Sequence, residues 1–272
     1  MSRICIVTAL PAESRVFIDA LKLRHVEARG LRLYAHEGYL LVQTGVGKLK
    51  AAAATAAVLQ TYPDIAGMIN TGVAGGDAEI GLAHIAHQFV DVSTGMQWFP
   101  HMPAMRILDN LPSATIRTVD APSEDYQTGS LLDMEAAGIM SAATQYLSTH
   151  QIHSIKVVSD NPSTHLSTVT SESVQSLMHE SLPAVRKLAD WLMHDTAANA
   201  LQQPLDDCCK TIQSHVHHTV TEQHRLRRLL QQHFALTGEL PETGPLVQLG
   251  SARRVNTALQ SSVQQAPLIY EG

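Results

Sequence analysis

The stretch Leu131-Leu132-Asp133-Met134-Glu135-Ala136-Ala137-Gly138 places a carboxylate between small and apolar residues where an apolar helix is expected to begin. Asp133 is a candidate N-cap, and small and apolar residues continue a helical pattern to about residue 147. Glu135 would then lie in the first turn, where the helix dipole favours an anion. A glutamate at a helix start also has a purely structural explanation, so its role has to be judged from the rest of the chain.

Two other apolar runs also end in glycine or polar residues. Ile69-Asn70-Thr71-Gly72-Val73-Ala74-Gly75-Gly76 predicts a strand that breaks into a glycine loop, and Ile155-Lys156-Val157-Val158-Ser159-Asp160-Asn161 predicts a strand that ends in polar groups. The first apolar run, residues 3–9, is followed by Glu13. Ligands of parallel α/β sheets bind beyond the carboxyl ends of the strands, so we expect these groups and Glu135 to meet there.

Strands alternate with helices along the first part of the chain, which predicts an α/β sheet with much parallel character. The glycine-bounded pair around Gly38 predicts a β-hairpin. Residues 93–113 contain three prolines and are expected to form a loop. The expected strands are residues 3–9, 31–34, 39–43, 66–70, 85–92, 115–119 and 154–158, and the expected helices are residues 13–23, 49–61, 133–147 and 171–194.

The composition indicates a globular protein. Hydrophobic residues make up 44% of the 272 residues and charged residues 16%, which excludes a globally disordered chain. The net charge of −6 gives no general attraction to nucleic acid, and no apolar run approaches the ~20 residues of a membrane span. The three cysteines show no framework spacing, and the first apolar run is better explained as a buried strand than as a signal peptide. We therefore expect a cytoplasmic protein that binds neither membranes nor nucleic acid.

The order of these motifs resembles that of the nucleoside phosphorylase/nucleosidase family over roughly residues 1–195. The nearest branch is the methylthioadenosine/S-adenosylhomocysteine nucleosidases. The resemblance implies a three-layer αβα phosphorylase-like fold around a central mixed, largely parallel sheet, with residues 1–196 as the domain and residues 197–272 as a helical C-terminal appendage. It also implies a homodimer and hydrolysis of the N-glycosidic bond of an adenine-containing purine nucleoside, with no cofactor and no metal ion.

The resemblance also implies roles for individual residues. Glu135 would bind the ribose hydroxyls, with Met134 packed against the sugar. Asp160, next to Ser159, would act as the general acid that protonates the departing base near N7, so it must hold a proton at the working pH. Glu13 would orient the attacking water. Each residue also has a structural explanation, since a polar turn follows many strands and a glutamate opens many helices.

The chain departs from the family pattern in two places. Val73-Ala74-Gly75 matches the family's Ser-Ala-Gly or Thr-Ala-Gly step, but Val73 replaces the hydroxyl residue and one polar contact is lost. The segment between Asp91 and Asp133 is shorter than in the nucleosidases and lacks the usual region that supplies an aromatic ring to the base. Trp98, Phe99 and Tyr126 are the remaining candidates for that ring, and Asp120-Ala121-Pro122 is the candidate replacement for a Gly-Asp-Ala-Phe step.

Two other functions stay open on sequence grounds. Related phosphorylases hold phosphate with an arginine in the first loop, and Arg15 keeps phosphate-dependent cleavage possible. Glu13 in that loop repels phosphate and favours water as the nucleophile. The second alternative is a non-catalytic nucleoside-binding or scaffold protein, because a fold does not guarantee its usual chemistry.

The tail, residues 197–272, has few apolar residues for a core of its own. One expected helix carries an apolar stripe of Leu226, Leu229, Leu230 and Phe234. We predict that this stripe docks on the first domain or on a partner subunit; the alternative is that the tail is a disordered extension. Arg225, Arg227 and Arg228 are expected on the solvated side of that helix. His215, His217 and His218 lack the spacing of a metal site and are also expected to be solvated.

Overall fold

The computed structural model describes residues 2–28, 30–100, 107–108, 111–194, 196–237 and 239–265. The chain divides into two compact units, Met1–His194 and Asp195–Gly272, and each is described by itself. The first unit contains the strands β1 Arg3–Thr8, β2 Arg24–Ala28, β3 Leu31–His36, β4 Tyr39–Gln43, β5 Ile65–Gly76, β6 Ala83–Asp91, β7 Gln97–Trp98, β8 Ser113–Thr118, β9 Ser130–Asp133 and β10 Ile152–Asp160. Its helices are α1 Pro11–Ala20, α2 Lys48–Thr61, α4 Ala136–Ala143 and α5 Ser171–His194, with short 3₁₀ turns at Thr149–Gln151 and Leu166–Thr168.

The strands form one mixed sheet in the order β10-β6-β8-β9-β5-β1-β4-β3-β2. β1 pairs in parallel with β4 and β5, and β10 pairs in parallel with β5 but antiparallel with β6. Because β5 also pairs with β9, the strands β5, β10, β6, β8 and β9 close into a ring. The predicted hairpin is present as the antiparallel pair β3 and β4.

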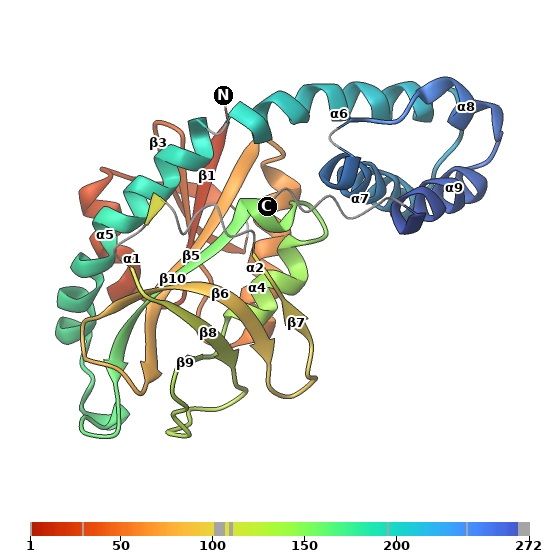
Figure 1. The fold of residues 1–272 in the computed structure, drawn as a ribbon. Helices are drawn as coiled ribbons and strands as arrows, with labels where there is room; N and C mark the ends of the chain where they lie inside the picture. The colour runs from red at the N-terminus through yellow and green to blue at the C-terminus, as the bar shows by residue number, and fades with distance from the viewer. Residues whose placement is uncertain are drawn as a thin grey trace. The chain divides into compact units, whose positions relative to one another are not determined.

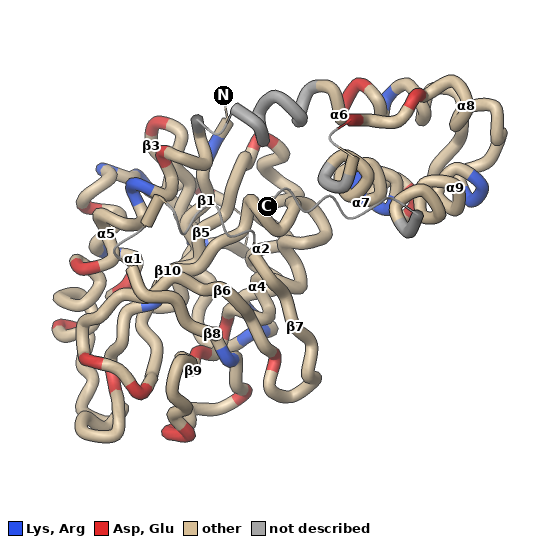
Figure 2. The backbone as a smooth tube through the Cα atoms, viewed as in Figure 1, with Lys and Arg blue, Asp and Glu red and all other residues tan. Residues whose placement is uncertain are grey.

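Helices cover both faces of the sheet (Figure 1). On one face, the buried side chains of α2 and α4 pack with those of the strands, including Val58 and Ile139. On the other face, Phe17 of α1 and Leu188 of α5 are fully buried in a second cluster. Figure 2 shows few charged residues along the strands. A sheet that is covered on both faces needs mainly apolar strand residues. This three-layer αβα arrangement confirms the predicted fold class.

The glycine-rich stretch is strand, not the predicted loop. β5 continues to Gly76 and pairs with β10 and β9 over this part. The glycines serve close approach rather than a turn: a Cβ at Gly76 would lie 2.3 Å from Cδ2 of Leu131. A methyl group fits there only if the side chain of Leu131 moves away.

Other boundaries and elements also differ from the predictions: α1 is Pro11–Ala20, and β7 and β9 were not expected. Asp133 is the last residue of β9 rather than a helix N-cap, and α4 begins at Ala136 and ends at Ala143, because the segment after Leu132 is still paired with β8. β2 was missed because its sequence, RHVEA, alternates between exposed and half-buried positions and has little apolar character. As the outermost strand of the order, β2 needs little burial to stay paired.

The second unit is helical and has its own core. Its helices are α6 Thr196–His215, α7 Val220–Thr237, α8 Thr243–Gln248 and α9 Ala252–Gln265. Leu226, Leu229 and Leu230 of α7 are buried among apolar side chains of this unit, including Ile212 and Leu259. The expectation that this leucine stripe needs the first domain or a partner subunit is therefore wrong, because helices that each carry few apolar residues together supply one shared core. Within the described residues, no helix has the length and apolar character needed to cross a membrane.

Candidate active site

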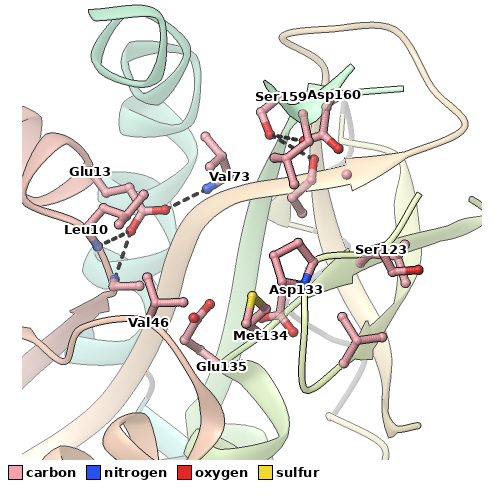
Figure 3. Close-up of a pocket in the computed structure, with 17 residues that line it drawn as sticks. Leu10, Glu13, Val46, Val73, Ser123, Asp133, Met134, Glu135, Ser159 and Asp160 are labelled. Carbon is pink, nitrogen blue, oxygen red and sulfur yellow. Dashed lines mark hydrogen bonds between the residues drawn. The ribbon is translucent and has the colours of Figure 1, made fainter. Parts of the chain in front are cut away.

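A pocket opens where the carboxyl ends of β1, β5, β9 and β10 meet (Figure 3). Seven of the eight residues that the sequence assigned to catalysis or substrate binding line it together: Glu13, Val73, Gly75, Met134, Glu135, Ser159 and Asp160. Asp120 is the exception, because its carboxylate lies 2.9 Å from Nζ of Lys48 and its side chain is 60% exposed. The pocket is otherwise lined by apolar side chains such as Leu10, Val46 and Leu166.

Glu13 is held by backbone donors. It sits in the first turn of α1, and its carboxylate accepts hydrogen bonds from the N–H groups of Ala9 and Leu10, both at 2.8 Å, and of Val73 at 3.0 Å. Burial raises the pKa of Glu13, and these donors and the Lys156 ammonium act in the opposite direction. Gly72 makes this position possible, since a Cβ there would lie 2.5 Å from Oε1 of Glu13.

Val73 contributes to the site through its backbone. Its N–H donates to Glu13, and this contact does not depend on the side chain. The hydroxyl that the family pattern places at this position is replaced by an apolar side chain that lines the pocket. The substitution therefore removes a side-chain donor but keeps the positioning of Glu13.

Glu135 lies at the start of α4, as its N-cap residue, and is buried. Its Oε1 accepts a hydrogen bond of 2.8 Å from the N–H of Gly47, in the turn before α2. Burial, and after it the neighbouring Asp133 carboxylate, raises the pKa of Glu135 to about 7, against the opposing effects of Lys156 and the Gly47 N–H. A nucleoside hydroxyl that donates to Glu135 would favour its ionised form.

Lys156 was not predicted as a site residue. It lies in the middle of β10 with its side chain buried, and its Nζ is 3.0 Å from Oδ2 of Asp133. Asp133 also accepts hydrogen bonds from Oγ1 of Thr118 at 2.7 Å and from the N–H of Ala136 at 2.9 Å. Burial lowers the pKa of Lys156, but the carboxylates of Asp133, Glu135 and Glu13 outweigh this and raise it. A lysine between the apolar residues Ile155 and Val157 was the available signal, because a buried ammonium needs carboxylate partners.

Asp160 ends β10 and is also buried. Its Oδ1 accepts a hydrogen bond of 2.6 Å from Oγ of Ser159, and its Oδ2 accepts one of 2.7 Å from the hydroxyl of Tyr126. Burial and the Asp160 carboxylate raise the pKa of Tyr126, so its hydroxyl remains a donor. Gly75 leaves room for both groups, since a Cβ there would lie 2.5 Å from Oδ2 of Asp160 and 2.8 Å from Cε1 of Tyr126.

The three aromatic residues proposed to stack on the base lie in different surroundings. Trp98 belongs to β7, pairs with Phe89 of β6 and packs against the core. Phe99 is 60% exposed. Tyr126 alone among these three contacts a predicted site residue, and it does so through its hydroxyl. Among the described residues, no cluster of three or more histidine, cysteine or acidic side chains is arranged to hold a metal ion.

The pocket therefore has two chemically different ends. The charged end consists of the lining residues Glu13, Asp133 and Glu135 together with Lys156, which pairs with Asp133. The hydroxyl-bound end consists of the lining residues Ser159 and Asp160 together with Tyr126, which donates to Asp160. The first offers buried carboxylates that can accept hydrogen bonds from hydroxyl groups or from water. The second offers one carboxyl group beside hydroxyl donors, the kind of group that can exchange a proton with a bound ligand.

No family model and no curated protein sequence matches this chain. Solved structures do. A 5′-methylthioadenosine/S-adenosylhomocysteine nucleosidase from Colwellia psychrerythraea 34H, in complex with adenine, superposes with a TM-score of 0.60 at 20% identity and covers 70% of this chain and 96% of its own. The nucleosidase of S. pneumoniae with a transition-state inhibitor gives 0.59 at 21% identity, with 69% and 98% covered.

Futalosine hydrolase of Helicobacter pylori strain 26695 is also similar, with a TM-score of 0.59 at 14% identity over 70% of this chain and 97% of its own. At 14% to 21% identity, the likeness to these structures concerns the fold. This chain has the fold of the nucleoside phosphorylase/nucleosidase proteins.

Proposed function

We propose that this protein is an N-glycosidase that hydrolyses the bond between adenine and ribose in an adenine-containing nucleoside. The observation that carries the proposal is that Glu13, Glu135 and Asp160, which lie far apart in the sequence, line one pocket at the carboxyl ends of the strands. The solved structures of similar fold include nucleosidases bound to adenine and to a transition-state inhibitor, which supports this reaction class.

In the proposed reaction, the bond between C1′ of ribose and N9 of adenine breaks with its electron pair going to the base. Asp160 gives a proton to the departing base at N7, and water adds to C1′. Glu13 accepts the hydrogen bond of that water and takes up its proton. Glu135 holds the ribose hydroxyls, so the charged end binds the sugar and the hydroxyl-bound end binds the base.

Water is the better nucleophile for this pocket than phosphate. Three carboxylates lie around one lysine at the charged end, so a phosphate dianion would be repelled. Arg15 does not offset this, because it pairs with Asp19 at 2.8 Å and its side chain is 64% exposed. The apolar side chains of Leu10, Val46, Val73 and Leu166 favour a substrate with an apolar 5′ substituent.

A substrate screen tests this proposal. The purified chain is incubated with methylthioadenosine, S-adenosylhomocysteine, adenosine, inosine and other modified adenosines, with and without phosphate, and base release is followed by chromatography. We expect adenine release without phosphate. Release that depends strictly on phosphate would instead identify a phosphorylase. Binding of these nucleosides without base release would identify the non-catalytic binding protein.

We also propose that the protein is a cytoplasmic homodimer. Leu49 is 82% exposed at the start of α2, and Val46, which lines the pocket, is 41% exposed. A partner subunit that covered these residues would remove apolar surface from water and close the pocket at the same time. The three cysteines are free and buried, as suits a reducing compartment. Light scattering at micromolar concentration tests the assembly: a monomer mass for the native chain would reject the dimer, and L49E is expected to shift a dimer to monomer.

A further inference from the structure

The second unit contains two helices joined by a turn of three residues. α8 ends at Gln248 and α9 begins at Ala252, so Leu249, Gly250 and Ser251 form the connection. Gly250 has φ +68°, a left-handed conformation that glycine adopts most easily after a helix end. Ser251 precedes the first turn of the next helix. Its carbonyl oxygen accepts a hydrogen bond of 3.0 Å from the N–H of Val255, and its hydroxyl oxygen accepts one of 3.4 Å from the N–H of Arg254. The turn is therefore a defined corner rather than a linker.

One face of α9 is fixed against the rest of the unit. Val255 and Leu259 are buried in the core together with Leu246 of α8 and the leucines of α7. Asn256 donates from Nδ2 to the carbonyl of Glu222 on α7, at 3.5 Å. The inward positions 252, 255, 256 and 259 follow helical spacing, so the opposite face of α9 is left for solvent or a ligand.

The outward face of α9 is cationic and polar. Arg253, Arg254 and Thr257 are exposed, and the sequence of α9, ARRVNTALQSSVQQ, contains no acidic residue. Within the described part of the chain, the guanidinium groups of Arg253 and Arg254 have no ion-pair partner. Two further arginines, Arg225 and Arg228, are exposed on the neighbouring α7, and the side chain of Arg225 donates to Gln260 of α9. Figure 2 shows the arginines at the start of α9 in blue.

We propose that this unit is a helix-turn-helix module that binds double-stranded DNA, with α9 in the major groove. In such modules two packed helices are joined by a three- or four-residue turn that often contains glycine, and the N-terminal part of the second helix contacts the bases. The position of Arg253 and Arg254 in the first turn of α9 suits contacts to phosphate or to guanine, and Thr257 one turn later suits a base edge. The absence of acidic residues from this face removes the repulsion that would oppose a phosphate backbone.

This inference replaces the expectation that the protein does not bind nucleic acid. That expectation came from the net charge of −6, which is a property of the whole chain. The charge that a DNA duplex meets is that of the surface that docks on it, and here a single helix without acidic residues forms that surface. The inference does not rest on the proposed nucleosidase activity.

Fluorescence anisotropy with the full chain tests the proposal. The probe is a labelled DNA duplex of random sequence. Its length of about 30 base pairs exceeds two half-sites spaced one helical turn apart. At about 50 mM salt we expect saturable binding that weakens steeply as salt is added, because bound counterions are released. The double substitution R253Q/R254Q is expected to weaken binding about tenfold or more and to reduce the slope of log affinity against log salt by about two.

A matched control removes two exposed arginines from the first unit, R24Q/R32Q. It has the same change in net charge, and its affinity for the duplex should stay within about twofold of the native chain, since it is not part of the proposed surface. Equal melting temperatures of the native chain and both double variants show that folding is unchanged. Three results would overturn the proposal: no binding at about 100 μM protein in low salt, equal losses in the two double variants, or tighter binding of single-stranded RNA or polyglutamate than of the duplex.

Discussion

The two ends of the pocket bury carboxylates in different ways. At the charged end, Lys156 and Asp133 form a buried ion pair at 3.0 Å, and backbone N–H groups hold Glu13 and Glu135. At the hydroxyl-bound end, Asp160 accepts hydrogen bonds from the side chains of Ser159 and Tyr126. The charged end is thus tied to the backbone of β5 and of the turns before α1 and α2, whereas the other end depends on two neutral hydroxyl groups.

This difference determines which substitutions can change activity without changing the stability of the fold. Removing one member of a buried ion pair leaves the other charge unpaired in the interior, which destabilises the whole domain. Removing a carboxyl group held by hydroxyls leaves donors that can rotate towards another acceptor. Substitutions at the hydroxyl-bound end should therefore change activity with little loss of stability, and those at the charged end should change both.

D160N is expected to give the largest effect on activity. Asparagine keeps the shape of the side chain but cannot supply the proton to the departing base, so kcat should fall by about 10² to 10⁴-fold. The melting temperature should change little, since the amide oxygen can still accept from one of the two hydroxyl groups and the amide NH2 can donate to the oxygen of the other. D125N is a matched control on an aspartate that is 66% exposed outside the pocket. Near-native kcat in D160N would remove Asp160 from the reaction.

K156M tests the charged end. Methionine fills similar space but leaves Asp133 buried without its cation, so the free energy of unfolding should fall by about 3 to 5 kcal/mol. Denaturant unfolding measures it, and K50M, at an exposed lysine of α2, serves as the control. Adding D133N to K156M removes the stranded charge, so the double variant should be more stable than K156M alone. A double variant less stable than K156M would show that the pair is not the source of the loss.

The sequence predicted which carboxyl groups come together in the pocket, but not the contacts that hold them there. Glu13, Glu135 and Asp160 follow or precede apolar runs, and apolar periodicity places those runs as strands and a helix. Lys156 was missed because its partners, Asp133, Glu135 and Glu13, are distant in the sequence and meet only in the folded sheet. A pairing of this kind has no local signal beyond the lysine itself.

The glycines show the same limit. Gly72 and Gly75 were interpreted as turn residues, because local sequence reports backbone freedom. In the structure they are strand residues whose missing side chains make room for Glu13 and Asp160. The prediction for the tail was wrong for a related reason. The leucines of α7 form a core with other helices of the tail, and each of these helices alone has too few apolar residues to indicate a core. Close approach and shared burial are properties of the assembled fold.

The raised pKa of Glu135 makes the stability of the fold depend on pH, and we expect this effect to be of intermediate size. The pKa of Glu135 is raised from 4.5 to about 7, so the folded protein holds a proton that the unfolded chain releases between these values. The stability contributed by this proton is complete below the unfolded pKa and is lost as pH rises through about 7. The melting temperature of the native chain should therefore fall relative to that of E135Q over this range. Parallel curves for the two proteins would contradict the raised pKa.

Ligand binding should show the opposite trend with pH. Ribose hydroxyls donate to the ionised form of Glu135, so affinity for a non-hydrolysable C-nucleoside analogue of adenosine should rise as pH increases through about 7. Calorimetry near neutral pH should also detect release of a proton on binding. E135Q should bind more weakly and without this pH dependence, which separates the effect of Glu135 from that of the other carboxylates.

Y126F gives the smallest expected effect and tests the hydroxyl-bound end most finely. The Tyr126 hydroxyl occupies Oδ2 of Asp160 in the free protein, and an incoming base must displace or share that hydrogen bond. Phenylalanine keeps the ring beside Gly75 but removes the competing donor, so adenine should bind about two- to tenfold more tightly. The same lost bond should lower the free energy of unfolding by about 1 kcal/mol, because it stabilises only the free state. Y146F is the control, since the Tyr146 hydroxyl contacts Gln60 outside the pocket. Weaker adenine binding in Y126F would mean that Tyr126 keeps its contact with Asp160 in the complex and helps to hold the base.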